Sequence, residues 1–205
     1  ADVVGLMEIA NNGFGELSAV QNLVDALNAE LTDEQAYRFI EIADADKYDG
    51  KFIGTDAITV GMLYRPARIT LDGAAKVIAT PEQHAAEGAQ TREKDGVVEK
   101  SPSSDKFQRH SLVQTFSIRD EKLTVVVTHL KSKGSGCIED WAEFNENAEP
   151  ADMQGKCNAF RVSAAKVLGD SLKDVEGDIL VIGDLNAYGK EDPVAVLTDY
   201  DASTT

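Results

Sequence analysis

Positive charge is scarce in this 205-residue chain, in which 20 Lys and Arg residues stand against 36 Asp and Glu residues. The formal net charge is −16 at pH 7. A surface this acidic repels nucleic acid at long range, which counts against a simple DNA-binding module with its usual basic footprint. The acidity does not exclude an enzyme that holds phosphate through metal ions and a few local cations.

Long apolar runs are also missing, because no stretch approaches the roughly 20 residues that span a bilayer. We therefore expect no association with a membrane. The sequence shows no signal peptide and begins within a strand-like run, so we expect that a leader or an earlier segment precedes it. Hydrophobic residues make up 42% of the chain, and neither a repeat nor a linker divides it, so we predict one domain over residues 1–205.

Cysteine occurs only twice, at Cys137 and Cys157, which flank a polar and acidic stretch. Two free surface thiols are one interpretation. We favour a disulfide that closes this loop, which implies an oxidising compartment and a secreted or periplasmic protein. In the chain-entropy model, closing a loop of this size contributes about 3 kcal/mol. Zinc binding is disfavoured, because the spacing is wrong and no histidine lies near either cysteine.

Hydrophobic periodicity predicts a chain of strands that is rich in hairpins, with helices before and after the central strands. Strands are expected over residues 2–9, 37–42, 57–65, 67–73, 75–79, 111–119, 122–130 and 178–184, and helices after Ser18, over 158–173 and over 192–197. The strand that contains Ile179–Ile182 is expected to be buried. Thr80–Phe107 is polar without sustained periodicity and is expected to be a long loop, and the stretch between the cysteines is expected to be a solvated flap. This pattern favours a β-sandwich with helices on its outer faces.

Several apolar strands end in a polar side chain: Glu8, His129, and the pair Asp184 and Asn186 in "GDLN". Burying such groups costs several kcal/mol unless they are paired or bind a cation. Residues i and i+2 of an extended segment point the same way, so Asp184 and Asn186 can face one ligand. The oxygen donors suit a hard divalent ion, Mg²⁺ or else Mn²⁺ or Ca²⁺.

Each of these residues also has a purely structural interpretation. Glu8 could be a hydrogen-bonded carboxylate at a strand end, His129 a satisfied core histidine, and "GDLN" a simple turn. Taken together and in this order, the residues favour a functional site.

The motifs "LMEI", "AITVGMLYRP", "FQRHSLVQTF", "VVVTHLKSKGSGC" and "VIGDLNAYGKEDP" resemble the endonuclease/exonuclease/phosphatase superfamily. Within it they look most like the secreted bacterial nucleases, and the resemblance covers nearly the whole chain. It implies a four-layer α/β sandwich of two mixed sheets flanked by helices. It also implies divalent-metal-dependent hydrolysis of phosphodiesters, with nucleic acid as the substrate, DNA rather than RNA.

The resemblance assigns roles to the residues at the strand ends. Glu8 matches the metal-binding glutamate, and Asp184 is implied to share the metal. His129 matches a catalytic histidine that stabilises charge on the phosphoryl group. Asp184 and Asn186 match the Asp-x-Asn pair that positions the attacking water and the phosphate. Asp56 is a candidate for orienting His129.

Further residues are implied to contact the substrate phosphate. Arg109 matches an arginine against that phosphate, and Asn158 and Arg161 match an N-x-x-R motif at the start of a helix. Lys131 and Lys133 supply local positive charge. The purely structural interpretations are a helix cap for Asn158, a surface charge for Arg161 and ordinary loop lysines for Lys131 and Lys133.

Two parts of the family pattern have no match. Relatives carry an earlier strand with an asparagine near the metal, and a late Asp-His pair whose histidine is the general base. No Asp-His dipeptide occurs in this sequence. We therefore expect a chain truncated at both ends, whose activity is reduced by the roughly 10²–10⁴-fold that general-base catalysis contributes.

The sequence thus predicts an extracellular, metal-dependent nuclease without an obligate protein partner. Two alternatives stay open. One is a phosphatase or phosphodiesterase acting on lipid or inositol phosphates, and the other is an inactive fragment or interaction domain on the same scaffold.

Overall fold

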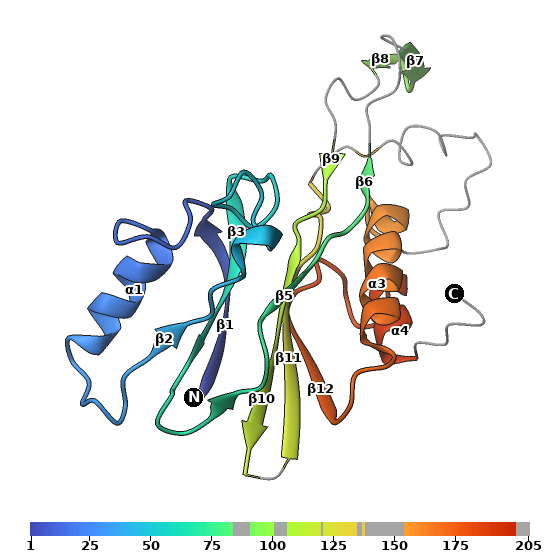
Figure 1. Cartoon of the computed structure of the whole chain (residues 1–205). Helices are drawn as coiled ribbons and strands as arrows, with labels where there is room; N and C mark the ends of the chain where they lie inside the picture. The colour runs from blue at the N-terminus through green and yellow to red at the C-terminus, as the bar shows by residue number, and fades with distance from the viewer. Residues whose placement is uncertain (84–90, 101–105, 120, 135–136, 138–153, 200–205) are drawn as a thin grey trace. The chain divides into compact units, whose positions relative to one another are not determined.

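The computed structural model describes residues 1–83, 91–100, 106–119, 121–134, 137 and 154–199 (Figure 1). The chain divides into two compact units. Unit 1 comprises Ala1–Ala79, Arg109–His129 and Ser171–Asp184, and unit 2 comprises Thr80–Gln108, Leu130–Asp170 and Leu185–Thr205. In the described ranges, no helix is both long and apolar enough to cross a membrane. The predicted flap between the cysteines falls outside these ranges, apart from its two ends.

The first sheet of unit 1 is antiparallel and has the strand order β1 (Val3–Ala10), β3 (Ile58–Tyr64) and β2 (Arg38–Phe39). Helix α1 (Ala19–Asn28) buries Val20 and Val24 in a cluster with Leu63 of β3. The predicted cap is confirmed, because Ser18 Oγ accepts the N–H of Gln21 at 3.2 Å. A short 3₁₀ helix, η1 (Asp44–Asp46), follows β2.

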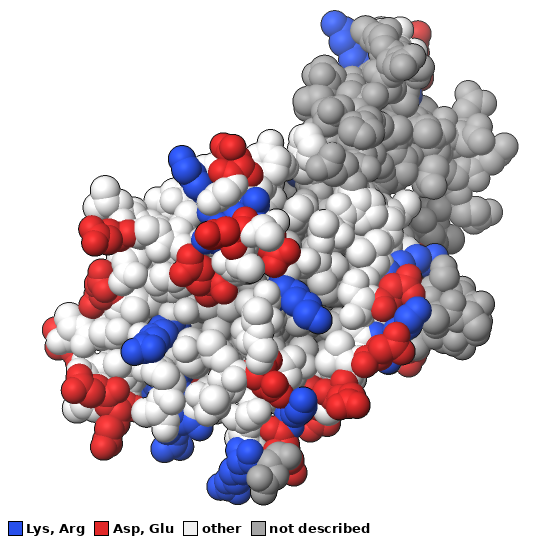
Figure 2. Space-filling view, in the orientation of Figure 1, with Lys and Arg blue, Asp and Glu red and all other residues white. Residues whose placement is uncertain are grey.

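Acidic side chains dominate the part of unit 1 that carries α1. Residues 1–37 contain no Lys or Arg. Figure 2 shows acidic side chains with few basic ones around α1. The exposed acidic residues in and around this helix are Glu16, Asp25, Glu30, Asp33 and Glu34.

The second sheet of unit 1 is mixed and has the order β12 (Asp178–Asp184), β11 (Glu121–His129), β10 (Ser111–Ile118) and β4 (Thr70–Leu71), with β5 (Lys76–Ile78) also paired to β10. Strands β10 and β11 form the predicted antiparallel hairpin. Strand β12 runs parallel to β11.

The two sheets of unit 1 share one apolar core. Met62 of β3, Phe116 of β10 and Val127 of β11 are all buried in the same cluster. Strand β1 can approach the second sheet because residue 5 is glycine, and a Cβ there would lie 2.7 Å from Ile182 Cδ1. Unit 1 therefore has two packed sheets with α1 on the first, which confirms the predicted α/β sandwich class.

The described residues of unit 2 form two small antiparallel ladders and two helices. The ladders pair β6 (Glu82–Gln83) with β9 (Lys106–Phe107) and β7 (Thr91–Lys94) with β8 (Val97–Lys100). The helices are α3 (Asn158–Leu172), whose last two residues belong to unit 1, and α4 (Asp192–Thr198).

The prediction of a long loop over Thr80–Phe107 is wrong for the described residues of this range, which include the strands β6 to β9. Asp95 and Gly96 join β7 to β8 with φ of 50° and 77°, and two consecutive positive φ values are typical of the tightest hairpin turn. The ion pair between Arg92 and Glu99 crosses the ladder. Both strands are only four residues long, and the two apolar residues of β8, both valines, are adjacent rather than alternating, so the hydrophobic periodicity is too weak to predict them.

The prediction that Ile179–Ile182 is buried is also wrong for its first half. Ile179 and Leu180 are 40% and 48% exposed. Within the described ranges β12 pairs with β11 alone and forms the edge of its sheet. Four apolar residues in a row therefore form an edge strand here, although such a run is typical of an interior one.

Gly183 lets β12 lie against β11 just before the strand ends. Its φ is +136°, and a Cβ at this position would collide with the carbonyl oxygen of Thr128, its partner in the ladder. Only glycine combines this conformation with so close an approach.

Replacing Gly183 with alanine should lower the free energy of unfolding by at least about 1–3 kcal/mol, the cost of a strained backbone conformation alone. At roughly 2–4 °C per kcal/mol, thermal unfolding followed by circular dichroism should show a Tm lower by several degrees. Gly15→Ala is the matched control, because a Cβ at Gly15 meets nothing within 4 Å. Equal Tm values for the two variants would contradict the close approach.

Candidate active site

Three strands of unit 1 bring polar side chains together. In the parallel ladder, His129 of β11 stands opposite Asp184 of β12, so the carboxyl ends of the two strands coincide. His129 Nε2 lies 3.8 Å from Asp184 Oδ2 and 3.9 Å from Glu8 Oε1 of β1. The two carboxylate oxygens can therefore be no farther apart than the sum of these distances.

Glu8 owes its position to an irregularity in β1. The ladder between β1 and β3 shifts register between Leu6 and Ile9, and Glu8 takes a φ of 58° in the left-handed region. A bulge re-aims a side chain that regular alternation would send elsewhere. A glutamate held in this conformation costs about 1–3 kcal/mol, and such strain is frequent at functional sites.

The imidazole is buried, whereas the two carboxylates are exposed to solvent. The side chain of His129 is 3% exposed, whereas those of Glu8 and Asp184 are 69% and 53% exposed. Burial, and then the positive charge of Arg109, lower the pKa of His129 below its usual value, against the opposing effect of Asp184, Glu8 and Asp56. The imidazole is therefore neutral at pH 7. Its Nδ1 is buried, and no described residue forms a hydrogen bond with it.

Arg109 and Asp56 form an ion pair beside this histidine. Arg109 Nε lies 3.0 Å from Asp56 Oδ2, and the two side chains are 12% and 29% exposed. The Nε–H is not aligned as a hydrogen bond, so the contact is a charge pair. The structure thus places Asp56 against a guanidinium, which is a stronger partner for a carboxylate than a neutral imidazole. Its role in orienting His129 stays a prediction.

Asn11, which the sequence did not single out, organises the loop that carries Asp56. Its Nδ2 donates to the carbonyl oxygens of Ile53 and Asp56, both at 2.9 Å, and its Oδ1 accepts the N–H of Ile53 at 3.1 Å. Its own N–H donates to the carbonyl of Ala57 at 2.9 Å. Asn11 follows β1 directly, so it ties the loop to the strand that presents Glu8.

Asn11→Ala should destabilise the chain by about 1–3 kcal/mol, because it leaves part-buried backbone groups of the loop without partners. It should also speed amide hydrogen exchange at Ile53, whose N–H loses its acceptor. Asn12→Ala is the control, since Asn12 Oδ1 accepts the N–H of Ala19 at the start of α1 instead. If Ile53 exchanges equally fast in both variants, Asn11 does not hold this loop.

The donors at this site fit Mg²⁺. In the described part of the chain, no three His, Cys, Asp or Glu side chains are close enough together to hold a metal ion by themselves. Two exposed carboxylates are nevertheless what Mg²⁺ uses, because it keeps several waters and completes its shell with substrate phosphate oxygens. Glu8 and Asp184 supply such a pair, each with a carboxylate oxygen within 4 Å of the same imidazole nitrogen.

Unit 2 holds the remaining predicted residues, on the loops that continue β11 and β12 and at the start of α3. Asn186 has a φ of 47° and donates from Nδ2 to the carbonyl of Leu130 at 3.0 Å. The N–H of Lys131 donates to Gln108 Oε1 at 2.8 Å, while Gln108 Nε2 donates to the carbonyl of Phe160 at 2.9 Å. Gln108, which is 4% exposed, therefore joins the loop after β11 to α3.

Arg161 lies in the interior of unit 2, with its side chain fully buried. Its guanidinium donates to the carbonyl oxygens of Lys131, Lys156 and Gly155 at 3.1, 2.7 and 3.2 Å. These bonds fix the backbone around Lys131, so any role toward a phosphate would be indirect. Asn158 donates from Nδ2 to Asp192 Oδ2 at 2.8 Å.

Glu191, another residue that the sequence did not single out, connects three segments of unit 2. Its carboxylate accepts from Lys133 Nζ at 2.8 Å, from the N–H of Gly155 at 2.9 Å and from the N–H of Tyr188 at 2.7 Å. Burial raises the pKa of this carboxyl, but the hydrogen bonds from Lys133, Tyr188 and Gly155 outweigh it, and the pKa lies below its usual value.

Because the pKa of Glu191 is lowered on folding, its stabilising effect should be complete above about pH 4.5 and be lost as the pH falls further. Glu191→Gln should lower the free energy of unfolding at pH 7 by about 1–3 kcal/mol, since Lys133 loses a charged partner. The difference in the free energy of unfolding between the unsubstituted chain and Glu191→Gln should shrink as the pH falls below about 4.5. Urea unfolding across this pH range checks the prediction, with Glu30→Gln, at an exposed position, as control. A difference that stays constant with pH would contradict it.

The predicted disulfide between Cys137 and Cys157 is confirmed. Both cysteines are buried and pack against Phe160 of α3. Cys157 directly precedes α3, so the bond anchors the start of this helix to the segment that follows β11.

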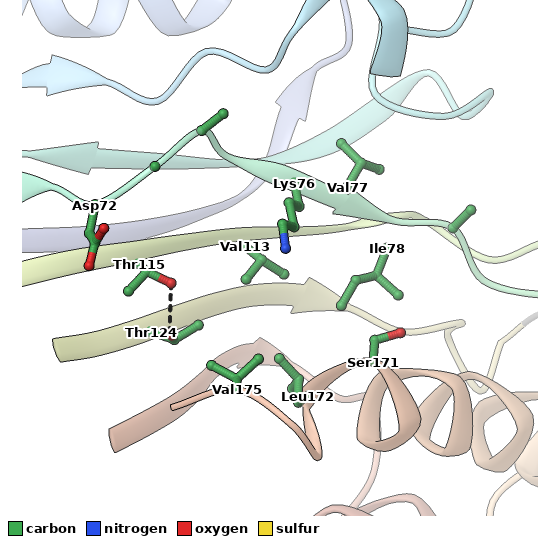
Figure 3. Close-up of a pocket in the computed structure, with 13 residues that line it drawn as sticks. Asp72, Lys76, Val77, Ile78, Val113, Thr115, Thr124, Ser171, Leu172 and Val175 are labelled. Atoms are coloured by element: carbon green, nitrogen blue, oxygen red, sulfur yellow. Dashed lines mark hydrogen bonds between the residues drawn. The ribbon is translucent and has the colours of Figure 1, made fainter. Parts of the chain in front are cut away.

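A separate cavity of about 500 Å³ in unit 1 contains none of the site residues (Figure 3). It lies beside β5 and β10 and is lined in part by Asp72, Thr115 and Thr124. Thr115 and Thr124 share a hydrogen bond of 2.8 Å, and Asp72 pairs with Lys122 at 3.0 Å. Asp72, Thr115 and Thr124 thus already have partners, and the candidate site residues all lie elsewhere.

No family model matches the sequence, and no curated protein matches it. Solved structures do match. The catalytic domain of human Nocturnin with bound sulfate has a TM-score of 0.54 at 14% identity, with 97% of this chain and 56% of that chain covered. A humanized D. rerio TDP2 has a TM-score of 0.51 at 18% identity, with 98% and 55% covered. ANGEL2, a 2′,3′-cyclic phosphatase, has a TM-score of 0.51 at 12% identity, with 97% and 43% covered.

This chain spans about half the length of these structures. All three are members of the endonuclease/exonuclease/phosphatase superfamily. At these identities the likeness concerns the fold. The chain therefore has the fold of the endonuclease/exonuclease/phosphatase superfamily, as the resemblance in sequence implied.

Proposed function

We propose that this chain is the core of a divalent-metal-dependent phosphodiesterase that cleaves nucleic acid outside the cytoplasm, with DNA as the preferred substrate. The observation that carries the proposal is the arrangement at the ends of β1, β11 and β12. There one buried, neutral imidazole lies within 4 Å of two exposed carboxylates. A purely structural histidine would not need two solvent-facing acids beside it.

Glu8 and Asp184 would hold the cation, and Mg²⁺ is the ion that their donor set fits best. When bound, it would supply positive charge that polarises a phosphoryl oxygen. Glu8 stays accessible because the bulge in β1 turns it toward solvent, where it is 69% exposed.

His129 and Arg109 would stabilise negative charge that develops on the phosphate. A neutral imidazole donates from one nitrogen only, and Nε2 is the one that faces the carboxylates. Arg109 is fixed by its pair with Asp56, so its charge is in place before substrate arrives. Asp184 would accept a hydrogen bond from the attacking water and orient it. Asn186, two residues further on, would bind the phosphate.

The disulfide supports an extracellular or periplasmic location, because such bonds persist in oxidising compartments. The preference for DNA rests on the sequence resemblance to secreted bacterial nucleases. A second candidate function is a phosphatase acting on smaller phosphate esters, which the fold likeness to ANGEL2 favours. A panel of DNA, RNA, a 2′,3′-cyclic nucleotide, an inositol phosphate and sphingomyelin separates these possibilities.

Asp184→Asn in the full chain should reduce cleavage of plasmid DNA by about 10²–10³-fold with Mg²⁺, the usual effect of losing one group that stabilises the transition state. Chelation by EDTA should abolish cleavage by the unsubstituted chain. Glu30→Gln, at an exposed position near α1, is the control and should cleave normally. Undiminished cleavage by Asp184→Asn would overturn the assignment.

The cation site has its own test, which does not depend on turnover. Adding Mg²⁺ should raise the Tm of the unsubstituted chain and of Glu30→Gln, because a ligand that binds only the folded state stabilises it. The rise should be lost in Glu8→Gln. An equal rise in all three chains would place the cation elsewhere, and no rise in any would favour a non-catalytic interaction domain.

A further inference from the structure

Tyr188 presents an aromatic ring to solvent, and its backbone is fixed by hydrogen bonds to Glu191. The residue is 77% exposed, two positions after Asn186 in the loop that follows β12. Its N–H donates to Glu191 Oε2 at 2.7 Å, and its carbonyl accepts the N–H of Glu191 at 2.8 Å. The backbone beneath the ring is therefore closed into a tight turn around a buried carboxylate.

The ring itself has a fixed neighbour on one face. Lys133 Nζ lies 3.8 Å from the ring centroid, and the same ammonium is tied to both carboxylate oxygens of Glu191 at 2.8 and 2.7 Å. A cation at this distance attracts the ring and limits its rotation. The high exposure of Tyr188 leaves its opposite face open to solvent.

A flat ring with one face anchored and the other open is suited to stacking. Every nucleobase has a π-face, and proteins that grip single-stranded or unpaired bases use such rings as platforms. The ring is already restrained in the free protein, so little side-chain conformational entropy is lost when a base binds. A single exposed aromatic needs no explanation on its own, but one that a lysine paired with a buried glutamate holds in place does.

We propose that Tyr188 is a stacking platform for a nucleobase of the substrate. This inference rests on the proposed function and refines it, because it selects nucleic acid over phosphate esters that lack a base. Tyr188 follows Asp184 by four residues, so chain connectivity keeps their Cα atoms within roughly 14 Å. That span is about four base steps of 3.4 Å along one strand.

The test compares two short single-stranded DNA oligonucleotides in EDTA, so that binding is measured without cleavage. One carries 2-aminopurine bases, and the other has the same backbone with abasic sites. Tyr188→Leu should weaken binding of the first by about 5- to 150-fold, the fold-change that corresponds to the loss of one base–aromatic stack. Binding of the abasic strand should not change. Quenching of 2-aminopurine fluorescence on binding should disappear in Tyr188→Leu.

Two further variants separate stacking from structural effects. Tyr188→Phe keeps the ring and should restore both affinity and quenching to near the unsubstituted values. Tyr48→Leu removes another exposed tyrosine, in unit 1, and should bind both strands normally. Tyr188→Leu should lower the Tm by no more than a few degrees, because the ring is mostly solvated and its loss removes one exposed cation–π contact.

Three results would overturn the platform. The first is equal weakening of the abasic strand, the second is unchanged binding of the 2-aminopurine strand, and the third is no binding by the unsubstituted chain. Failure of the proposed function looks different, since DNA would then stay uncut in Mg²⁺ while the binding and quenching differences persist. If DNA is cleaved normally but Tyr188→Leu binds the 2-aminopurine strand as the unsubstituted chain does, the stacking platform is overturned and the proposed function stands.

Discussion

The parallel register between β11 and β12 is the constraint on which the candidate site depends. It sets His129 opposite Asp184, and a slip by one residue would turn every side chain of β12 to the other face of the sheet. The register can persist to the end of the strands because Gly183 carries no Cβ against Thr128. Backbone pairing inside a packed sheet, rather than a loop, thus fixes the distance between imidazole and carboxylate.

The other residues of the candidate site have two roles. Some supply charge, and others hold the loops in place. In unit 1 the charged groups are held by direct contacts, with Glu8 on its bulge and Arg109 against Asp56. In unit 2 the loops are tied by buried polar side chains whose hydrogen bonds go mainly to backbone atoms, as for Gln108 and Glu191. A buried polar group with its partners in place rigidifies a loop, whereas the same group left without them would destabilise it.

The sequence predicted the elements that local pattern determines. The hairpin of β10 and β11, the Ser18 cap and the disulfide are confirmed, because alternation, capping chemistry and cysteine pairing are local or paired signals. Asn11 and Glu191 were missed, since an amide in a turn and an acid in a charged loop look ordinary until tertiary contacts appear. The exposure of Leu180 could not be predicted either, because an apolar run does not reveal whether its strand lies at an edge.

The acidic surface around α1 affects the order in which ligands reach the molecule. Residues 1–37 hold no basic side chain, and a field of this sign gathers cations from the medium, doubly charged ones most strongly. The same field slows the approach of a polyanion until salt screens it within about 10 Å at 0.1 M ionic strength. Divalent cations therefore accumulate near this surface. If the substrate is nucleic acid, as proposed above, moderate salt should assist its approach, whereas for a basic DNA-binding protein salt weakens binding.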